Sequence, residues 1–138
     1  MFFNYTEIYN IKTSPLFKAI ESSNFYFNSA YIHDVDVMEN IGLMNLLTSS
    51  SAYFNNSKIY DIIFKRVLDN AYFINFSSTS CLTFKNTEIR DINIDGDLIY
   101  IESSDENSNS LYIDGSSFKK FNITSGSIIK ISTNKVSN

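Results

Sequence analysis

A nine-residue block recurs five times along this chain, each copy without insertion or deletion. Positions one, six and nine of the block are apolar in every copy, and the successive starts lie 24, 27, 30 and 29 residues apart. The copies are FNYTEIYNI from Phe3, FNSAYIHDV from Phe27, FNNSKIYDI from Phe54, FKNTEIRDI from Phe84 and IDGSSFKKF from Ile113. Repeats of this length indicate a solenoid, in which each repeat packs against its neighbours.

A second, shorter block lies between the copies of the first. It is apolar at positions one, two and four, and reads LFKA from Leu16, LMNL from Leu43, FINF from Phe73, LIYI from Leu98 and IIKI from Ile128. The corner that follows this block has a constant length of five residues at first, whereas the corner that precedes it varies. Short strands of constant length joined by such corners are typical of a β-solenoid.

The two blocks together predict a right-handed parallel β-helix of about five coils, each of roughly 27 residues. Coils stacked about 4.8 Å apart would align equivalent positions into inward columns along the axis. The leucine-rich repeat is excluded because its consensus is absent, and a β-sandwich would not repeat the same chemistry in register. The predicted columns are Phe3/Phe27/Phe54/Phe84/Ile113, Ile8/Ile32/Ile59/Ile89/Phe118 and Ile11/Val35/Ile62/Ile92/Phe121.

Composition supports an all-β chain and excludes several functions. The 138 residues fit one domain, and they include 12 Phe and 9 Tyr but only four Gly and one Pro. One cysteine and one histidine leave little material for a disulfide framework, a zinc site or a Ser-His-Asp triad, so no cofactor or metal is expected. A net charge of −4 argues against nucleic acid as a partner, and no apolar run is long enough to span a membrane.

The two ends of the sequence favour a fragment. The opening MFFNYTEIYN has neither a basic region nor a continuous apolar stretch, so no signal peptide is visible. Met1 starts either a cytosolic protein or a piece of something larger. The repeats begin at residue 3 without a polar cap, which a free solenoid end needs. We therefore expect residues 1–138 to form one module of a longer solenoid.

The coil pattern, with FKNTEIRDI, LIYIESS and SGSIIKIS, resembles the pectin-lyase-like right-handed β-helix repeats. The glycine-poor variety rich in Asn, Ser, Ile, Phe and Tyr is most similar to the scaffoldin repeats of anaerobic gut fungal cellulosomes. This resemblance implies a secreted protein with a cohesin-like role, which docks the dockerin domains of plant-cell-wall-degrading enzymes. Chlamydial polymorphic membrane proteins carry similar repeats, but their glycine-rich companion motif is absent here.

Position eight of the nine-residue block is the main candidate for catalysis. Its members Asp34, Asp61 and Asp91 would stack about 5 Å apart with Arg90 beside them, close enough to hold a cation or to raise a pKa. Asn10 in the same column favours the alternative, a structural corner whose short polar side chain bonds local backbone. The paired-Asp and Gly-His-Gly signatures of polygalacturonases and the arginine motif of pectate lyases are absent.

The lone histidine and the lone cysteine are predicted to be inert. Neighbours in a strand point to opposite faces, so His33 and Asp34 are not expected to form a dyad, and His33 is predicted to be a solvated surface residue. Cys81 shares a polar column with Ser51 and Ser110 and has no base nearby in the pattern.

Outward tyrosines form the candidate binding surface. The strand before each nine-residue block carries the outward column Phe2, Tyr26, Tyr53, Thr83 and Tyr112. Stacked tyrosines stabilise a sheet face, but they also present a rigid amphipathic surface of the kind that protein interfaces and sugars use. The predicted partner-binding residues are Tyr26, Tyr53, Tyr112, Tyr31, Tyr60 and Asp61.

These observations favour a non-catalytic extracellular scaffold module that binds the dockerins of carbohydrate-active enzymes. A β-helix that binds or cleaves a polysaccharide remains as the alternative, and a third possibility is an adhesin or surface stalk that binds nothing. The loop 102–110 is a further candidate for specificity, because inserted corners of solenoids carry it.

Overall fold

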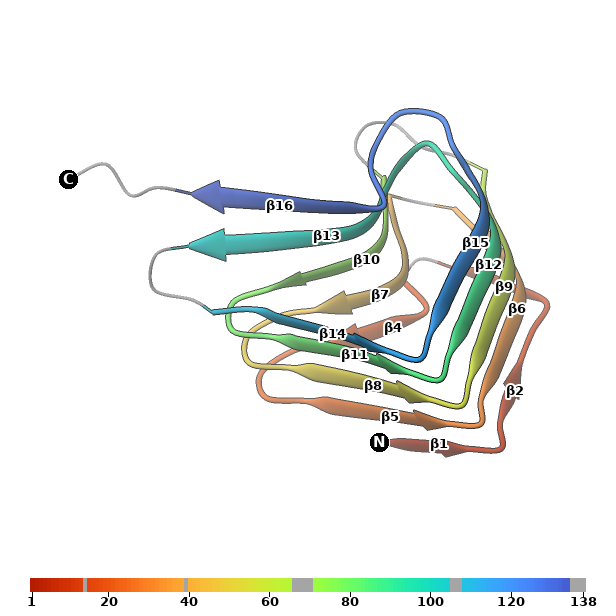
Figure 1. Cartoon of the computed structure of the whole chain (residues 1–138), viewed down its shortest axis with the longest axis horizontal. Helices are drawn as coiled ribbons and strands as arrows, with labels where there is room; N and C mark the ends of the chain where they lie inside the picture. The colour runs from red at the N-terminus through yellow and green to blue at the C-terminus, as the bar shows by residue number, and fades with distance from the viewer. Residues whose placement is uncertain (14, 39, 66–70, 105–107, 135–138) are drawn as a thin grey trace.

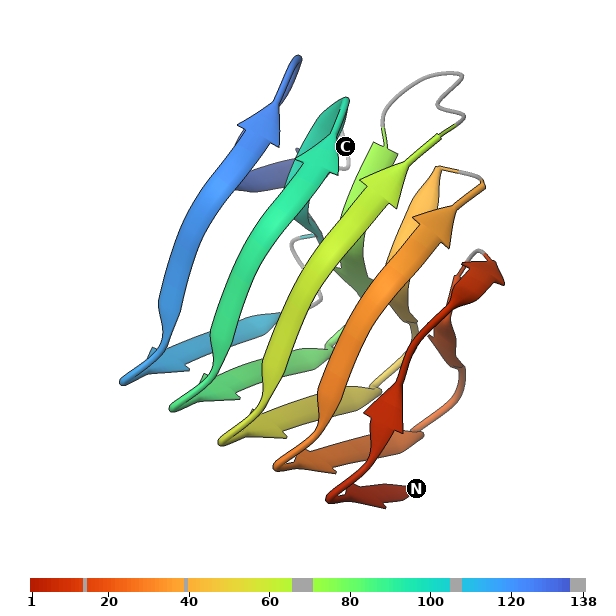
Figure 2. The same cartoon turned by 90° about the vertical axis from the view of Figure 1, so that its right-hand side faces the viewer.

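The structure is a computed structural model that describes residues 1–13, 15–38, 40–65, 71–104 and 108–134. The described residues contain strands and corners and no helix, and every strand pairing is parallel. Three sheets run along a common axis (Figures 1 and 2), so the chain is an all-β parallel solenoid, as predicted. Residues 105–107 of the candidate specificity loop lie outside the described residues.

Each coil contributes one strand to each sheet, except that the first coil contributes two short strands to sheet II. Sheet I consists of β1 (Phe2–Asn4), β5 (Asn24–Asn28), β8 (Ser51–Asn55), β11 (Cys81–Lys85) and β14 (Ser110–Asp114). Sheet II consists of β2 (Glu7–Ile8) with β3 (Ile11–Thr13), β6 (Tyr31–Val37), β9 (Lys58–Phe64), β12 (Glu88–Ile94) and β15 (Ser117–Ile123). Sheet III consists of β4 (Phe17–Ala19), β7 (Ile41–Leu46), β10 (Ala71–Ser77), β13 (Gly96–Ser104) and β16 (Ile129–Asn134).

The hand of the winding follows from the two views. In Figure 1 the chain runs counter-clockwise through sheets I, II and III, and Figure 2 places the last coils on the side that faces the viewer of Figure 1. A path that turns counter-clockwise while it advances toward the viewer is right-handed. The five strands of sheet I give four turns from β1 to β14, and β15 and β16 continue the fifth coil.

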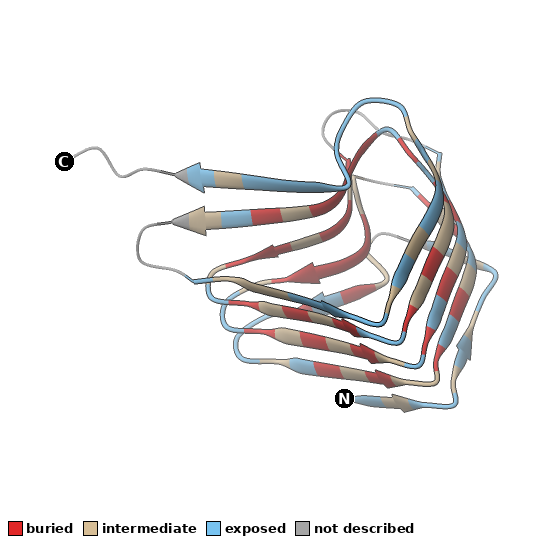
Figure 3. Cartoon of the chain, viewed as in Figure 1, coloured by how far each residue is buried: buried red, intermediate tan, exposed pale blue. Residues whose placement is uncertain are grey.

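The predicted inward columns are confirmed residue by residue. Phe27 pairs with Phe3 and Phe54, Ile59 pairs with Ile32 and Ile89, and the shorter blocks align in the same way in sheet III. The phenyl rings of Phe27 and Phe54 stack with their centroids 4.4 Å apart. These columns form one apolar core between the three sheets (Figure 3). Such burial of aromatic and branched side chains is what stabilises the coil stack.

The last coil leaves its core columns uncovered. Ile113, Ile129 and Ile131 continue inward columns, yet 42–63% of each residue is exposed. Figure 3 shows this change as blue segments along β14, β15 and β16. This end of the core therefore presents apolar surface.

The corner between sheets I and II repeats one backbone conformation in every coil. Its third block position has φ between 50° and 58°, the left-handed region in which Asn and Gly are the least strained residues. The five residues there are Tyr5, Ser29, Asn56, Asn86 and Gly115. The next position supplies hydroxyl groups: Ser57 Oγ accepts a hydrogen bond from Ala30 N at 3.1 Å, and Ser116 Oγ accepts one from Thr87 N at 3.0 Å. These bonds satisfy backbone groups that the turn takes out of the ladder.

Candidate functional site

The outer face of sheet I carries a stack of aromatic rings. Phe2, Tyr26 and Tyr53 occupy matching positions on β1, β5 and β8. Their ring centroids are 4.7 Å apart between Phe2 and Tyr26 and 5.0 Å apart between Tyr26 and Tyr53, with interplanar angles of 11° and 5°. Thr83 on β11 interrupts the stack, and Tyr112 on β14 follows it in the same column with 60% of its surface exposed.

A ladder of asparagines runs beside these rings. Asn4, Asn28 and Asn55 align two residues further along the same strands, so they face the same side of the sheet. Asn55 Nδ2 donates a hydrogen bond to Asn28 Oδ1 at 3.0 Å, which links two coils. The ladder continues with Lys85 and then Asp114.

The rings and the amides enclose a shallow hollow of about 370 Å³ on this face. Its walls are lined by Phe2, Asn4, Tyr26, Phe27, Asn28, Tyr53 and Asn55. Face-to-face stacking covers both faces of the Tyr26 ring, so this ring presents its edge and its phenol hydroxyl to the hollow. An apolar patch bordered by hydroxyl and amide groups is the surface chemistry of a protein interface.

The six predicted binding residues do not lie on one face. Tyr26, Tyr53 and Tyr112 share the outer column of sheet I, whereas Tyr31 and Tyr60 lie on β6 and β9 of sheet II. There they occupy different columns, since Tyr31 pairs with Lys58 and Tyr60 pairs with His33. The Lys58 ammonium lies 5.8 Å from the centroid of the Tyr31 ring, an exposed cation–π contact.

Position eight of the block is a corner in which every member has a left-handed backbone. The φ angles of Asn10, Asp34, Asp61, Asp91 and Lys120 lie between 53° and 56°. In the ladders of sheet II, pairing skips this position: His33 pairs with Tyr60 and Val35 with Ile62, while the aspartates between them are unpaired in the ladder. The alternative of a structural corner is therefore supported by the backbone, because Asn and Asp tolerate this conformation best among residues with side chains.

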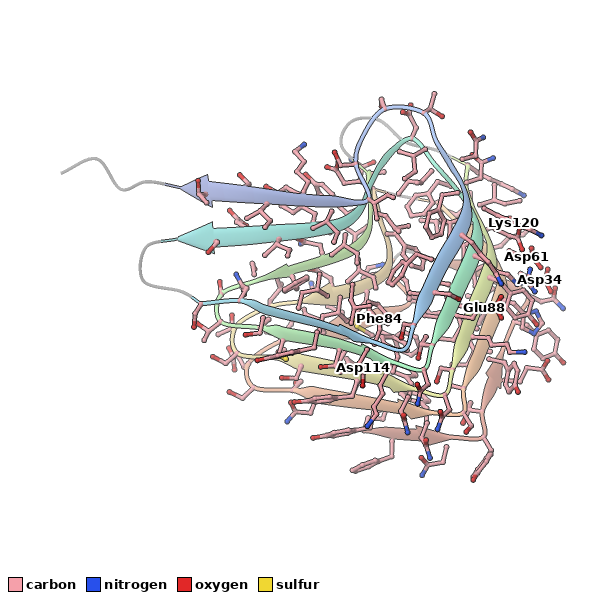
Figure 4. All side chains as sticks on the ribbon, in the orientation of Figure 1. Asp34, Asp61, Phe84, Glu88, Asp114 and Lys120 are labelled. Atoms are coloured by element: carbon pink, nitrogen blue, oxygen red, sulfur yellow. The ribbon has the colours of Figure 1, made fainter. Side chains whose placement is uncertain are left out.

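An acidic hollow adjoins this corner on the outer side of sheet II. Its volume is about 310 Å³, and its lining includes Lys12, Asp34, Asp36 and Asp61. Figure 4 shows Asp34, Asp61 and Lys120 on this outer side and Phe84 in the interior. Within the described residues no group of three or more His, Cys, Asp and Glu side chains is placed to hold a metal ion.

The structure corrects the prediction for His33. Its side chain is only 13% exposed and lies between the rings of Tyr9 and Tyr60, at centroid distances of 5.5 and 4.8 Å. Nδ1 lies 2.7 Å from Asp34 Oδ2, and Nε2 lies 3.0 Å from Glu7 Oε1. His33 is thus a packed, doubly bonded residue and contacts its neighbour Asp34. The left-handed backbone at Asp34 turns that carboxylate to the side of the imidazole, which strict strand alternation does not allow.

Two opposing effects act on the pKa of His33. Partial burial lowers it, but hydrogen bonds and charge interactions with Glu7 and Asp34 outweigh burial and raise the pKa above its usual value of 6.5.

Further along sheet II the outer face is a network of ion pairs. The Arg90 guanidinium lies 4.5 Å from the centroid of the Tyr60 ring and contacts Asp91. Lys119 Nζ lies 2.5 Å from Glu88 Oε1, and this hydrogen bond lowers the pKa of Glu88. The charges of this face are therefore mostly paired with one another, which leaves it less suited to binding a charged ligand.

One polar group on sheet III escaped the sequence analysis. Asp97 is 2% exposed, accepts a hydrogen bond from Ser127 N at 2.9 Å and lies 3.2 Å from Lys130 Nζ. The hydrogen bond to Asp97 raises the pKa of Lys130. Tyr72 and Tyr100 stack beside this pair at 4.3 Å. The third position of the shorter block, occupied by Tyr100 and Lys130, signals an outward column there. Asp97 lies near the start of β13, in register with Tyr72, and precedes the shorter block, so it carries no repeat signal.

Comparisons of the chain with protein-family models, with curated proteins and with solved structures find no match. The parallel β-solenoid is therefore established by the structure, and the resemblance to pectin-lyase-like and scaffoldin repeats remains a hypothesis. Within the described residues no helix is long and apolar enough to cross a membrane.

Proposed function

We propose that this chain is a non-catalytic binding module of an extracellular scaffold, and that the outer face of sheet I holds a protein partner. The observation that supports the proposal most is the hollow of about 370 Å³ in which stacked aromatic rings adjoin an asparagine ladder. Tyrosine is enriched where proteins bind one another, because it combines a large rigid surface with a hydroxyl group at a low cost in conformational entropy.

The arrangement of the rings favours a protein over a sugar. Sugars stack on ring faces, but the faces of Tyr26 are covered on both sides by Phe2 and Tyr53. Around Tyr26, the ring edge, the phenol hydroxyl and the amides of Asn28 and Asn55 remain for a partner. Such a mixed surface matches another protein surface, which supplies apolar groups and hydrogen-bonding groups together.

The resemblance to scaffoldin repeats makes the proposed partner more specific. The partner is then a dockerin domain carried by a plant-cell-wall-degrading enzyme, and the module is secreted as part of a larger scaffold. Three features support it: the solenoid, the repeated coil chemistry and the aromatic face.

The affinity of the chain for isolated fungal dockerin domains, measured by calorimetry, tests this proposal. The double variant Tyr26→Ala/Tyr53→Ala removes the rings of sheet I and is expected to weaken binding at least tenfold, as for interface hot spots. The matched control Tyr72→Ala/Tyr100→Ala removes the stacked pair of sheet III and is expected to change affinity less than twofold. Equal losses in both variants would contradict the assignment of the face.

The acidic hollow of sheet II supports a second candidate function, binding or cleavage of a polysaccharide. Asp34, Asp36 and Asp61 line it together with Lys12, so carboxylates and a cation face one space. Release of unsaturated or reducing sugars from pectin, with and without calcium, measures this activity. Loss of such activity in Asp61→Asn would favour this candidate over the scaffold.

A further inference from the structure

The aromatic stack on sheet I is interrupted at a single position. Thr83 pairs in register with Tyr53 on one side and with Tyr112 on the other. Tyr53 stacks on Tyr26, but its other face is turned toward Thr83. Among the residues that the structure describes, no ring contact joins Tyr53 to Tyr112.

The spacing of the coils sets the size of this interruption. Neighbouring strands lie about 4.8 Å apart, so the backbones of Tyr53 and Tyr112 are separated by about 9.6 Å. The rings of Tyr26 and Tyr53, one coil apart, are 5.0 Å from each other. A threonine side chain is much shorter than a tyrosine side chain. The space over Thr83, at the distance from the sheet where the tyrosine rings lie, can therefore hold one additional ring. That ring would stack on both tyrosines at the spacing that the rest of the column already has.

The neighbours of Thr83 define the surroundings of this slot, which we name the Thr83 slot. Cys81 and Lys85 flank it on the same side of β11, and Cys81 Sγ lies 3.9 Å from Thr83 Oγ1. Lys85 is exposed, and its register partner on β14 is Asp114, so an acidic residue of this chain already lies beside it. The feature that distinguishes the slot is therefore the pair of tyrosines on its two sides.

We propose that the protein partner inserts one aromatic side chain into the Thr83 slot, between Tyr53 and Tyr112. This inference rests on the proposed function and names the chemistry of its partner at that site. A flat ring matches the near-parallel rings of the column, whose interplanar angles are 5° and 11°. A sugar chair is thicker than a flat ring and fits this spacing less well.

The first test fills the slot from within. Thr83→Phe would supply the absent ring, so we expect at least a tenfold loss of affinity for the dockerin partner together with a higher urea midpoint of unfolding. The matched control Thr83→Val keeps the size and β-branching of threonine and is expected to bind within twofold of the unmodified chain. Unchanged affinity in Thr83→Phe would overturn the proposal.

The same measurements separate this inference from the proposed function. If Tyr26→Ala/Tyr53→Ala loses affinity while Thr83→Phe does not, the proposed binding face is supported and the proposed insertion into the Thr83 slot is refuted. If neither variant loses affinity, both fail.

A second test needs neither the partner nor a folded Thr83 variant. N-acetyl-L-tryptophanamide is titrated into the chain while the Thr83 methyl resonance is followed by NMR. Insertion between two rings predicts an upfield shift of that methyl signal, which Tyr112→Ala should reduce by at least half. A shift produced by methyl β-D-glucopyranoside and absent with the aromatic probe would overturn the proposal in favour of a sugar. Absence of any shift with the aromatic probe would also overturn it.

Discussion

The imidazole of His33 is hydrogen-bonded to the carboxylate of Asp34, the next residue in the chain, at 2.7 Å. The left-handed backbone of Asp34, with a φ of 53°, brings both side chains to the outer face of sheet II. The other ring nitrogen meets Glu7 of the preceding coil at 3.0 Å. An ionised carboxylate only accepts hydrogen bonds, so the two contacts are both hydrogen bonds when both ring nitrogens carry a proton, and this arrangement favours the imidazolium form of His33.

This geometry makes the first two coils sensitive to pH. The pKa of His33 is raised, so its contribution to stability is fully present below about pH 6.5 and is lost as the pH rises through the folded-state pKa. We expect a pKa above 6.5 in an NMR titration of the imidazole. The chain has one histidine, so its ring signal needs no assignment.

Glu7→Gln provides the control for this titration, because it removes one of the two carboxylates while keeping the side chain's shape. The pKa of His33 is then expected to fall toward its usual value. The titratable and charged groups around His33 are Glu7, Asp34, Tyr9 and Tyr60, with Asp61 and Arg90 further along the column. A pKa at or below 6.5 in the unmodified chain would contradict the double hydrogen bond.

The corner at Lys120 offers a stabilising substitution. Lys120 has a φ of 56° at a position where the other coils carry Asn or Asp. A left-handed backbone costs residues such as lysine about 1–2 kcal/mol, and Asn tolerates it better. Lys120→Asn is therefore expected to raise the free energy of unfolding by about 1 kcal/mol, measured by urea denaturation.

Lys119→Asn is the matched control for this substitution. It changes the neighbouring lysine, which pairs regularly in the ladder with Arg90 and lies 2.5 Å from Glu88. No stabilisation is expected there. Loss of the ion pair between Lys120 and Asp91, 3.9 Å apart and exposed, has little effect because surface pairs of this kind contribute little. Equal effects of the two variants would argue against backbone strain as the cause.

The phenylalanine column is the most sensitive part of the core. Phe54 is fully buried and stacks on Phe27 at 4.4 Å and on Phe84 at 5.2 Å. Phe54→Ala is expected to lower the free energy of unfolding by about 3–5 kcal/mol, through lost burial and the cavity that remains. In Phe2→Ala, where 70% of the residue is exposed, the expected loss is about 1 kcal/mol or less. Both free energies of unfolding are measured by urea denaturation, and equal losses in the two variants would contradict the account.

The hydroxyl of Ser57 holds the corner between sheets I and II. It is buried, accepts a hydrogen bond from Ala30 N and donates to a backbone carbonyl. Ser57→Ala would leave Ala30 N without that partner, so a loss of about 1–3 kcal/mol in the free energy of unfolding is expected. Ser51→Ala, on the outer side of β8, should change it by about 0.5 kcal/mol or less.

The inward columns could be predicted because each coil repeats the same apolar positions and because parallel stacking places equivalent residues over one another. Phe27 over Phe3 and Ile59 over Ile32 follow from that logic alone. His33 could not be placed correctly, since its contacts depend on the left-handed corner that follows it. Asp97 was missed because it lies near the start of β13, just before the shorter block, where the repeat gives no signal.

The positions of the candidate binding residues in the fold could be predicted in part. The column of Tyr26, Tyr53 and Tyr112 follows from strand alternation and from the period of the coils. Tyr31 and Tyr60 lie on sheet II, since the corner at Ser29 and Asn56 turns the chain there, and their part in binding stays a prediction. Linear sequence shows which residues face outward, but the turn of the corner decides which face they share.

The most direct test of the central claim, that the outer face of sheet I is the binding surface, is an NMR map of the tyrosine ring signals on addition of a dockerin domain. The account predicts shifts for Tyr26, Tyr53 and Tyr112 and unchanged signals for Tyr72 and Tyr100 on sheet III. Shifts confined to Tyr31 and Tyr60, or to sheet III, would contradict it.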